Sequence, residues 1–221
     1  METNLSTELV FILDRSGSMS GMEGDTIGGF NSMLAMQKTH PCNCRITTVL
    51  FDNICEVLHD RIDINAVTPI TAREYFVRGS TALLDAIGKT IDKIGGAQKN
   101  TAPKYRAQKV LFVITTDGME NSSREYSYKK IRSMIERQKT KYNWEFIFLG
   151  ANIDAEETAG KFGIEKNRAQ NFLNDSEGIA LNYRVLSETV TEFREAPAKS
   201  HLSDRWSAEI QKDFTRRGGK R

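Results

Sequence analysis

The sequence has no apolar run long enough to cross a bilayer. Two of its longest runs, 110–115 and 146–150, fall far short of the roughly 20 residues that a spanning helix needs. The first residues, Met-Glu-Thr-Asn-Leu-Ser, lack the basic and apolar stretches of a secretory signal, so we expect a cytoplasmic protein. A hydrophobic fraction of 39% over 221 residues is enough for a packed domain and argues against global disorder.

Cysteine is scarce, and the chain has only three: Cys42, Cys44 and Cys55. An odd number cannot all pair within one chain, and we expect reduced thiols. The alternative is a zinc cluster with His40 and His59, but the paired C-x-x-C spacing of such clusters is missing. A predicted hairpin over 45–60 would also place Cys55 opposite Leu50 and far from the other thiols.

A large net charge is also missing, since the formal net charge is +2. This balance argues neither for nor against nucleic acid as a partner. The charge is uneven, because residues 195–221 carry seven Lys/Arg against four Asp/Glu, which leaves residues 1–194 at −1. We expect 1–194 to form the domain and 195–221 to be a basic C-terminal extension, with a short helix within 203–215 and disorder at 218–221.

The segment 124–141 is rich in cations, with seven Lys/Arg and two acidic residues. Four cations precede it and offer a phosphate-binding patch as one interpretation: Lys99, Lys104, Arg106 and Lys109. Binding of that kind weakens steeply with salt. The alternative, which we favour, is the solvated face of an outer helix.

Apolar runs alternate with segments of helical periodicity. Runs typical of strands buried on both faces occupy 8–13, 110–116, 144–149 and, more weakly, 168–173. Helical spacing occurs over 24–38, 81–94, 123–141, 154–162 and 176–193, with Gly95-Gly96 predicted to end the second helix. This order predicts an α/β fold with a doubly wound, mostly parallel central sheet covered by helices on both faces. The hairpin 45–60 adds one antiparallel edge strand.

Oxygen-bearing side chains follow the predicted strand ends. They come from three segments, D-R-S-G-S at 14–18, R-G-S-T at 78–81 and T-D-G at 116–118. Ligands in such sheets bind beyond the carboxyl ends of the strands, where these segments meet. Five side chains are therefore candidate metal ligands: Asp14, Ser16, Ser18, Thr81 and Asp117. Each alone is also typical of a turn or a helix cap, but together they form a hard oxygen set that favours Mg²⁺, with Mn²⁺ or Ca²⁺ as alternatives.

The same segments carry a resemblance to a known family. D-R-S-G-S at 14–18, G-S-T-A-L-L-D-A-I at 79–87 and T-T-D-G at 115–118 resemble the metal-ion-dependent adhesion site of von Willebrand factor A-type domains. The similarity extends from about residue 8 to about residue 193 and looks like a stand-alone, bacterial-like form. It implies that the three hydroxyls bind the metal directly and the two aspartates directly or through water. It also implies a partner protein whose Glu or Asp completes the metal shell.

We therefore expect a metal-dependent protein-interaction module, an adaptor or scaffold that binds an acidic or phosphorylated group of its partner. Four residues are expected at the rim that contacts the partner: Met19, Met22, Ser80 and Gly118. We expect no catalytic residue, and we expect neither a membrane nor a nucleic acid as a partner. The alternative is a Mg²⁺-dependent phosphoryl or ester hydrolase, which needs a base or nucleophile beside the ion. His40, His59 and His201 all fall outside the predicted metal loops.

Overall fold

The computed structural model describes residues 6–219, and the strands within this range form one six-stranded sheet in the order β3-β2-β1-β4-β5-β6. Their bounds are β1 Thr7–Asp14, β2 Cys44–Phe51, β3 Cys55–Asp63, β4 Lys109–Thr116, β5 Glu145–Gly150 and β6 Ala169–Asn171. All neighbouring pairs are parallel except β2 and β3, which form an antiparallel hairpin at one edge. The predicted mostly parallel sheet with one antiparallel edge strand is confirmed.

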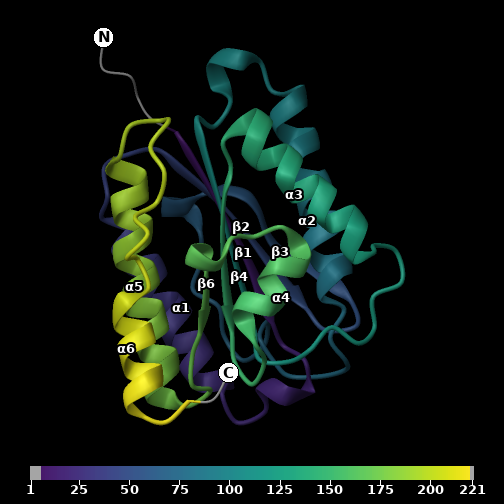
Figure 1. Cartoon of the computed structure of the whole chain (residues 1–221). Coiled ribbons are helices and arrows are strands. Elements are labelled where there is room, and N and C mark those ends of the chain that lie inside the picture. The colour runs from purple at the N-terminus through teal and green to yellow at the C-terminus, as the bar shows by residue number, and fades with distance from the viewer. Residues whose placement is uncertain (1–5, 220–221) are drawn as a thin grey trace.

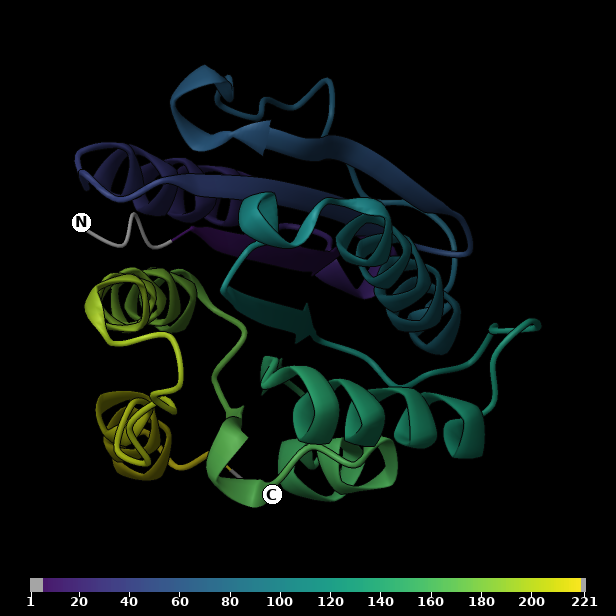
Figure 2. The same ribbon diagram turned by 90° about the horizontal axis from the view of Figure 1, so that it is seen from above.

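Helices cover both faces of this sheet. They are α1 Glu23–Lys38, α2 Leu83–Asn100, α3 Tyr128–Tyr142, α4 Ala155–Phe162, α5 Ser176–Glu195 and α6 Ala208–Arg216. Short 3-10 turns lie at Gly17–Met19, Ile64–Ala66, Pro103–Tyr105 and Lys166–Arg168. Figure 1 shows α1, α5 and α6 on one side of the sheet and α2, α3 and α4 on the other, and Figure 2 shows the same arrangement from above. No helix of the described residues is long and apolar enough to span a membrane.

Strand β1 runs through the middle of the core and explains the unbroken apolar run in the sequence. Leu9 and Phe11 belong to the hydrophobic cluster under α1 and α5, whereas Val10 and Ile12 belong to the cluster under α2, α3 and α4. Alternate side chains of a strand point to opposite faces, so a strand covered on both faces has consecutive apolar positions, here from Leu9 to Leu13. The whole strand is buried up to Asp14.

Two helix ends differ from the prediction. Helix α2 continues through Gly95-Gly96 to Asn100, because neither glycine adopts the positive φ that would end a helix there. Helix α3 begins at Tyr128 instead of residue 123, and the side chain of Ser127 caps it by accepting a hydrogen bond from the Lys130 amide. The hairpin register also differs by one residue, since Cys55 pairs with Phe51 and not with Leu50. The expected separation of Cys55 from Cys44 holds, because the two residues lie at opposite ends of the hairpin.

The described part of the C-terminal extension packs against the domain. Three of its apolar side chains join the cluster under α1 and α5: Leu202, Trp206 and Ile210. The indole Nε1 of Trp206 donates to the carbonyl of Asn167 at 2.8 Å. The division of the chain at residue 194 stays a prediction, but this apolar contact holds residues beyond it on the core.

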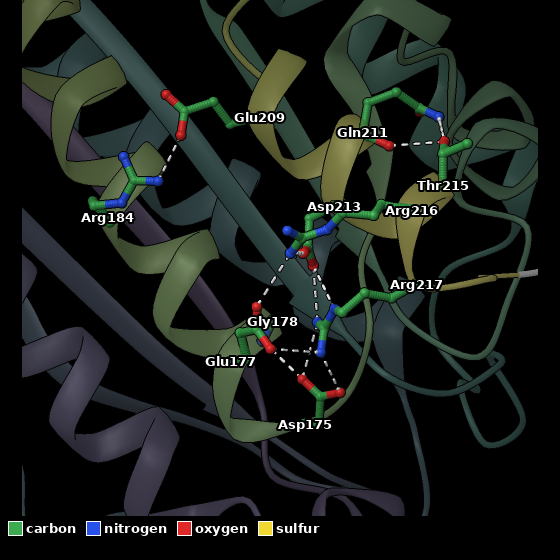
Figure 3. Close-up of polar contacts among 10 residues, drawn as sticks. All are labelled: Asp175, Glu177, Gly178, Arg184, Glu209, Gln211, Asp213, Thr215, Arg216 and Arg217. Carbon is green, nitrogen blue, oxygen red and sulfur yellow. Dashed lines mark hydrogen bonds and ion pairs between the residues drawn. The ribbon is translucent and has the colours of Figure 1, made fainter.

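Salt bridges add to this contact (Figure 3). Arg217, just after α6, reaches Asp175 at the start of α5 at 2.9 Å and also Asp213 of its own helix at 2.8 Å. Arg184 of α5 pairs with Glu209 of α6 at 2.6 Å. Within the segment 218–221, the amide of Gly219 donates to the carbonyl of Phe214 at 2.9 Å. Residues 220–221 lie outside the described residues, and the predicted disorder of this segment stays a prediction.

We expect Trp206→Ala to lower the free energy of unfolding by about 3 kcal/mol, because it removes an indole that is only 7% exposed together with its hydrogen bond. Urea denaturation followed by circular dichroism measures the change. Tyr105→Ala, at an aromatic side chain that is 62% exposed, is the control and should stay within about 0.5 kcal/mol of the wild type. Equal stability of the two variants would show that the extension contributes nothing to the core.

Candidate metal centre

The ends of β1 and β4 hold the carboxylate of Asp14, the first candidate residue. The two strands are parallel neighbours with Leu13 opposite Thr115, so Asp14 and Thr116 end side by side. The hydroxyl of Thr116 donates to Asp14 Oδ2 at 2.6 Å, and the amide of Ser16 donates to Asp14 Oδ1 at 2.7 Å. Both carboxylate oxygens of Asp14 are therefore held in place.

A chain of hydroxyl contacts continues from this carboxylate to the loop after β4. The Oγ atoms of Ser16 and Ser18 lie 3.1 Å apart, and Ser18 Oγ donates to Asp117 Oδ1 at 2.6 Å. A Cβ placed on Gly118 would lie 3.3 Å from Ser18 Oγ and 3.6 Å from Thr81 Oγ1, so both hydroxyls border this glycine. The structure thus gathers all five candidate side chains at one place, whereas metal binding by them stays a prediction.

The two carboxylates of the site are buried and have no cationic partner in the described part of the chain. Asp14 and Asp117 are each 2% exposed, and no ion pair to either is found among residues 6–219. Burial raises the pKa of Asp14 to about 6 against the opposing effect of its hydrogen bonds from Thr116 and Ser16, and the charge of Asp117 raises it further. Burial also raises the pKa of Asp117. A pair of desolvated acids beside three neutral hydroxyls fits a divalent cation, which would supply the missing positive charge.

Two asparagines that sequence reasoning missed hold the loops of the candidate site. Asn174 Nδ2 donates to Asp117 Oδ2 at 3.0 Å. Asn121 Oδ1 accepts from the amide of Thr81 at 2.9 Å, and its own amide donates to the carbonyl of Thr81 at 3.0 Å. Both residues come from loops far from their partners in sequence, so no local pattern identifies them.

The loop after Asp117 and the start of α2 are joined by reciprocal hydrogen bonds. Asp85 accepts from the three consecutive amides of residues 124–126, each at 2.9 Å. In return Glu120 accepts from the Leu84 amide at 2.9 Å, and Ser123 Oγ accepts from the Asp85 amide at 3.1 Å. These contacts fix the segment that carries Asp117 against the helix that follows Thr81.

The expected rim is only partly exposed. Met19 is 7% exposed and offers little surface to a partner, because its side chain is taken into the protein, and Met22 packs partly against the core cluster under α1 and α5. Ser80 and Gly118 are half-buried beside Thr81 and Asp117. Met119 is 71% exposed directly after the T-T-D-G segment, and sequence reasoning missed it.

The other candidate groups lie elsewhere. His59 bonds to Thr48 in the edge hairpin, His40 faces Glu195, and His201 faces Glu145 at the start of β5. All three cysteines are free, and no group of three or more His, Cys, Asp or Glu among residues 6–219 is arranged to hold a metal.

The structure does not form the whole basic patch that the sequence offered as one interpretation of residues 124–141 and the cations before them. Lys109 is buried and donates to the carbonyl of Ala196, so it takes no part in an exposed patch. Two helix cations are already paired with acids, Arg132 with Glu136 and Lys139 with Glu165. These contacts agree with the interpretation of α3 as an outer helix.

No protein-family model and no curated protein sequence matches the chain. Solved structures do resemble it. The D319A mutant of the PilB minor pilin from Streptococcus sanguinis has a TM-score of 0.62 at 13% identity, over 89% of this chain and 65% of that chain. The von Willebrand factor type A protein from Catenulispora acidiphila has a TM-score of 0.57 at 14% identity, over 85% and 43%.

A third similar structure is proximal thread matrix protein 1 from the mussel byssus with a zinc-occupied metal-ion-dependent adhesion site. Its TM-score is 0.56 at 15% identity, over 86% of this chain and 46% of that chain. The chain thus spans 65% or less of the length of these three proteins. At such low identity the likeness shows a common fold.

We expect Asp85→Asn to lower the free energy of unfolding by about 2 kcal/mol, because an amide nitrogen replaces one acceptor of a carboxylate that binds three amides. Hydrogen exchange at residues 124–126 should become faster. Glu188→Gln on α5 is the control, since Glu188 is exposed and pairs with Arg184 away from this loop. If both variants match the wild type in stability and exchange, Asp85 does not anchor this loop.

Proposed function

We propose that this chain, whose fold is that of von Willebrand factor A-type domains, is a divalent-metal-dependent protein-interaction module. The observation that carries the proposal is the convergence of five oxygen-bearing side chains from three loops. Two of these side chains are buried carboxylates that have no cationic partner among residues 6–219. The proposed ligands are Asp14, Ser16, Ser18, Thr81 and Asp117.

The residues of the site would contribute to cation binding in two ways, through negative charge and through neutral oxygen donors. Asp14 and Asp117 neutralise a dication, while the hydroxyls of the three other residues add donors without further charge. A cation bound there supplies Lewis acidity toward an anionic oxygen of a partner. We propose Mg²⁺, because hard oxygen donors suit it, with Mn²⁺ and Ca²⁺ as alternatives that accept the same donor set.

The partner is proposed to present a carboxylate or a phosphate group to this site. Gly118 supports the proposal, because any side chain there would meet the hydroxyls of Ser18 and Thr81 and narrow the approach. Met119 is 71% exposed beside the site and offers flexible apolar contact area around the anion. We infer a role as an adaptor or scaffold, and the three free thiols fit the cytoplasmic location that we propose.

A hydrolase built on the same cation is the second candidate, and the geometry favours it less. The three histidines bond to residues outside the site, which leaves no imidazole base beside it.

Calorimetric titration of metal-free protein with Mg²⁺ and with Mn²⁺ should show saturable binding that Asp14→Ala and Ser16→Ala abolish. The far-ultraviolet circular dichroism spectrum of both variants should stay that of the wild type, because the site lies at the carboxyl ends of the central strands and outside the hydrophobic clusters. Asp60→Ala is the control, since this exposed carboxylate on β3 pairs with Lys93 away from the site. A wild type that binds neither metal refutes the proposal, and variants that bind as before refute the residue assignment.

The partner chemistry is tested with immobilised peptides that differ only at one central residue, which is Glu, Asp, phosphoserine or Gln. The proposal expects the anionic peptides to bind in Mg²⁺ and to lose binding in chelator or with Asp14→Ala protein. Equal retention of the Gln peptide would rule out recognition of an anion through the metal.

A further inference from the structure

Arg15, the residue between two proposed metal ligands, is fully buried. Burying a guanidinium group is costly unless its nitrogens find acceptors. Here its Nε donates to Asp52 Oδ2 at 3.0 Å, one terminal nitrogen to the carbonyl of Glu74 at 3.2 Å, and the other to Glu56 Oε2 at 2.6 Å. Each of its three nitrogens therefore has a partner, from three different positions.

A second arginine completes this arrangement. Arg78 Nε donates to the same Oδ2 of Asp52 at 2.7 Å, and Asp52 is fully buried. The ring of Phe76 lies 5.3 Å from the Arg15 guanidinium and 5.2 Å from that of Arg78, so both cations contact its face. We call Arg15, Asp52, Arg78 and Phe76 the arginine brace.

Backbone hydrogen bonds around Arg15 join two of the three segments that carry proposed ligands, those at 14–18 and 78–81. The Arg15 amide donates to the carbonyl of Phe51 at 2.8 Å, and its carbonyl accepts from the Arg78 amide at 2.9 Å. The Gly17 amide donates to the Gly79 carbonyl at 3.2 Å, two residues before Thr81. The loop after β1, the β2–β3 turn and the segment before α2 are thus held to one another through Arg15.

The directions of the side chains explain why the arginine brace lies apart from the oxygens of the candidate metal site. In an extended chain, alternate side chains point to opposite sides, and Ser16 has extended backbone angles. Asp14 and Ser16 therefore present oxygens on the side of the site, while Arg15 between them turns to the acidic acceptors on the other side. Fixing Arg15 fixes the orientation of both neighbours.

We propose that Arg15 is a positioning residue of the metal site, which holds Asp14 and Ser16 in register with Thr81. The expected effect of Arg15 on metal affinity rests on the proposed function, whereas its expected effect on the order of the loop does not require metal. Lysine cannot replace arginine here, since a single ammonium group does not reach three acceptors arranged around a planar fork. Arg78 would remain on Asp52 in an Arg15 variant, so that buried carboxylate keeps a partner.

The test compares Arg15→Met and Arg15→Lys with the wild type. We expect both to weaken Mg²⁺ and Mn²⁺ binding by about 10- to 100-fold in calorimetry, as losses of supporting contacts around metal ligands do. In metal-free protein, hydrogen exchange at residues 14–18 and 79–82 should accelerate. Arg168→Met is the matched control, because Arg168 is also buried and pairs with Glu145 and Asp204, but at the opposite edge of the sheet.

The outcomes separate this inference from the proposed function. Folded Arg15 variants with wild-type affinity and exchange overturn it, as does an equal loss in Arg168→Met, which would reflect general destabilisation. If the wild type binds no metal but exchange at 14–18 accelerates in Arg15→Met, the proposed function fails and the role of Arg15 in ordering the loop stands. If Arg15→Met does not fold, Arg15→Lys decides because it keeps the positive charge, and wild-type exchange at 14–18 in that variant overturns the inference.

Discussion

The parallel pairing of β1 with β4 at the centre of the sheet is the constraint on which the candidate site depends. Both strands are buried on both faces, so their register is held by the two hydrophobic clusters that cover them. That register sets Asp14 beside Thr116, and the hydroxyl of Thr116 holds the carboxylate at 2.6 Å. The apolar core and the polar edge are therefore two consequences of one strand pairing.

Charge is distributed unequally across the loop after β1. On one side, Asp14 and Asp117 are buried with no cation among the described residues within ion-pair distance. On the other side, one buried carboxylate, Asp52, serves two arginines. A protein that only needed stability would gain little from either arrangement, since desolvated charges are costly. The unequal distribution has an explanation if Asp14 and Asp117 bind a cation while Asp52 and its two arginines hold the loop in place.

Most of the sheet and the gathering of the five candidate side chains could be predicted from the sequence. Apolar runs that end in Asp14 and Asp117 mark buried parallel strands, and parallel strands end at a common edge. Features set by contacts between distant segments could not be predicted. The start of α3 is delayed because Asp85 holds the amides before it, and the burial of Met19 depends on packing that no periodicity reveals. The acceptors of Arg15 likewise lie 37 or more residues away in the sequence.

The position of the candidate site has a mechanical consequence. Asp14 ends the central strand of the sheet, and β1 has parallel neighbours, β2 and β4, on its two sides. A tensile load applied at this carboxylate along the strand axis would place the hydrogen bonds to both neighbours in shear together, so that they would not open one after another. A load applied to an edge strand such as β3 would be carried by the hydrogen bonds to one neighbouring strand, β2. A load at the end of β1 would thus be shared by the hydrogen bonds on both sides of the strand.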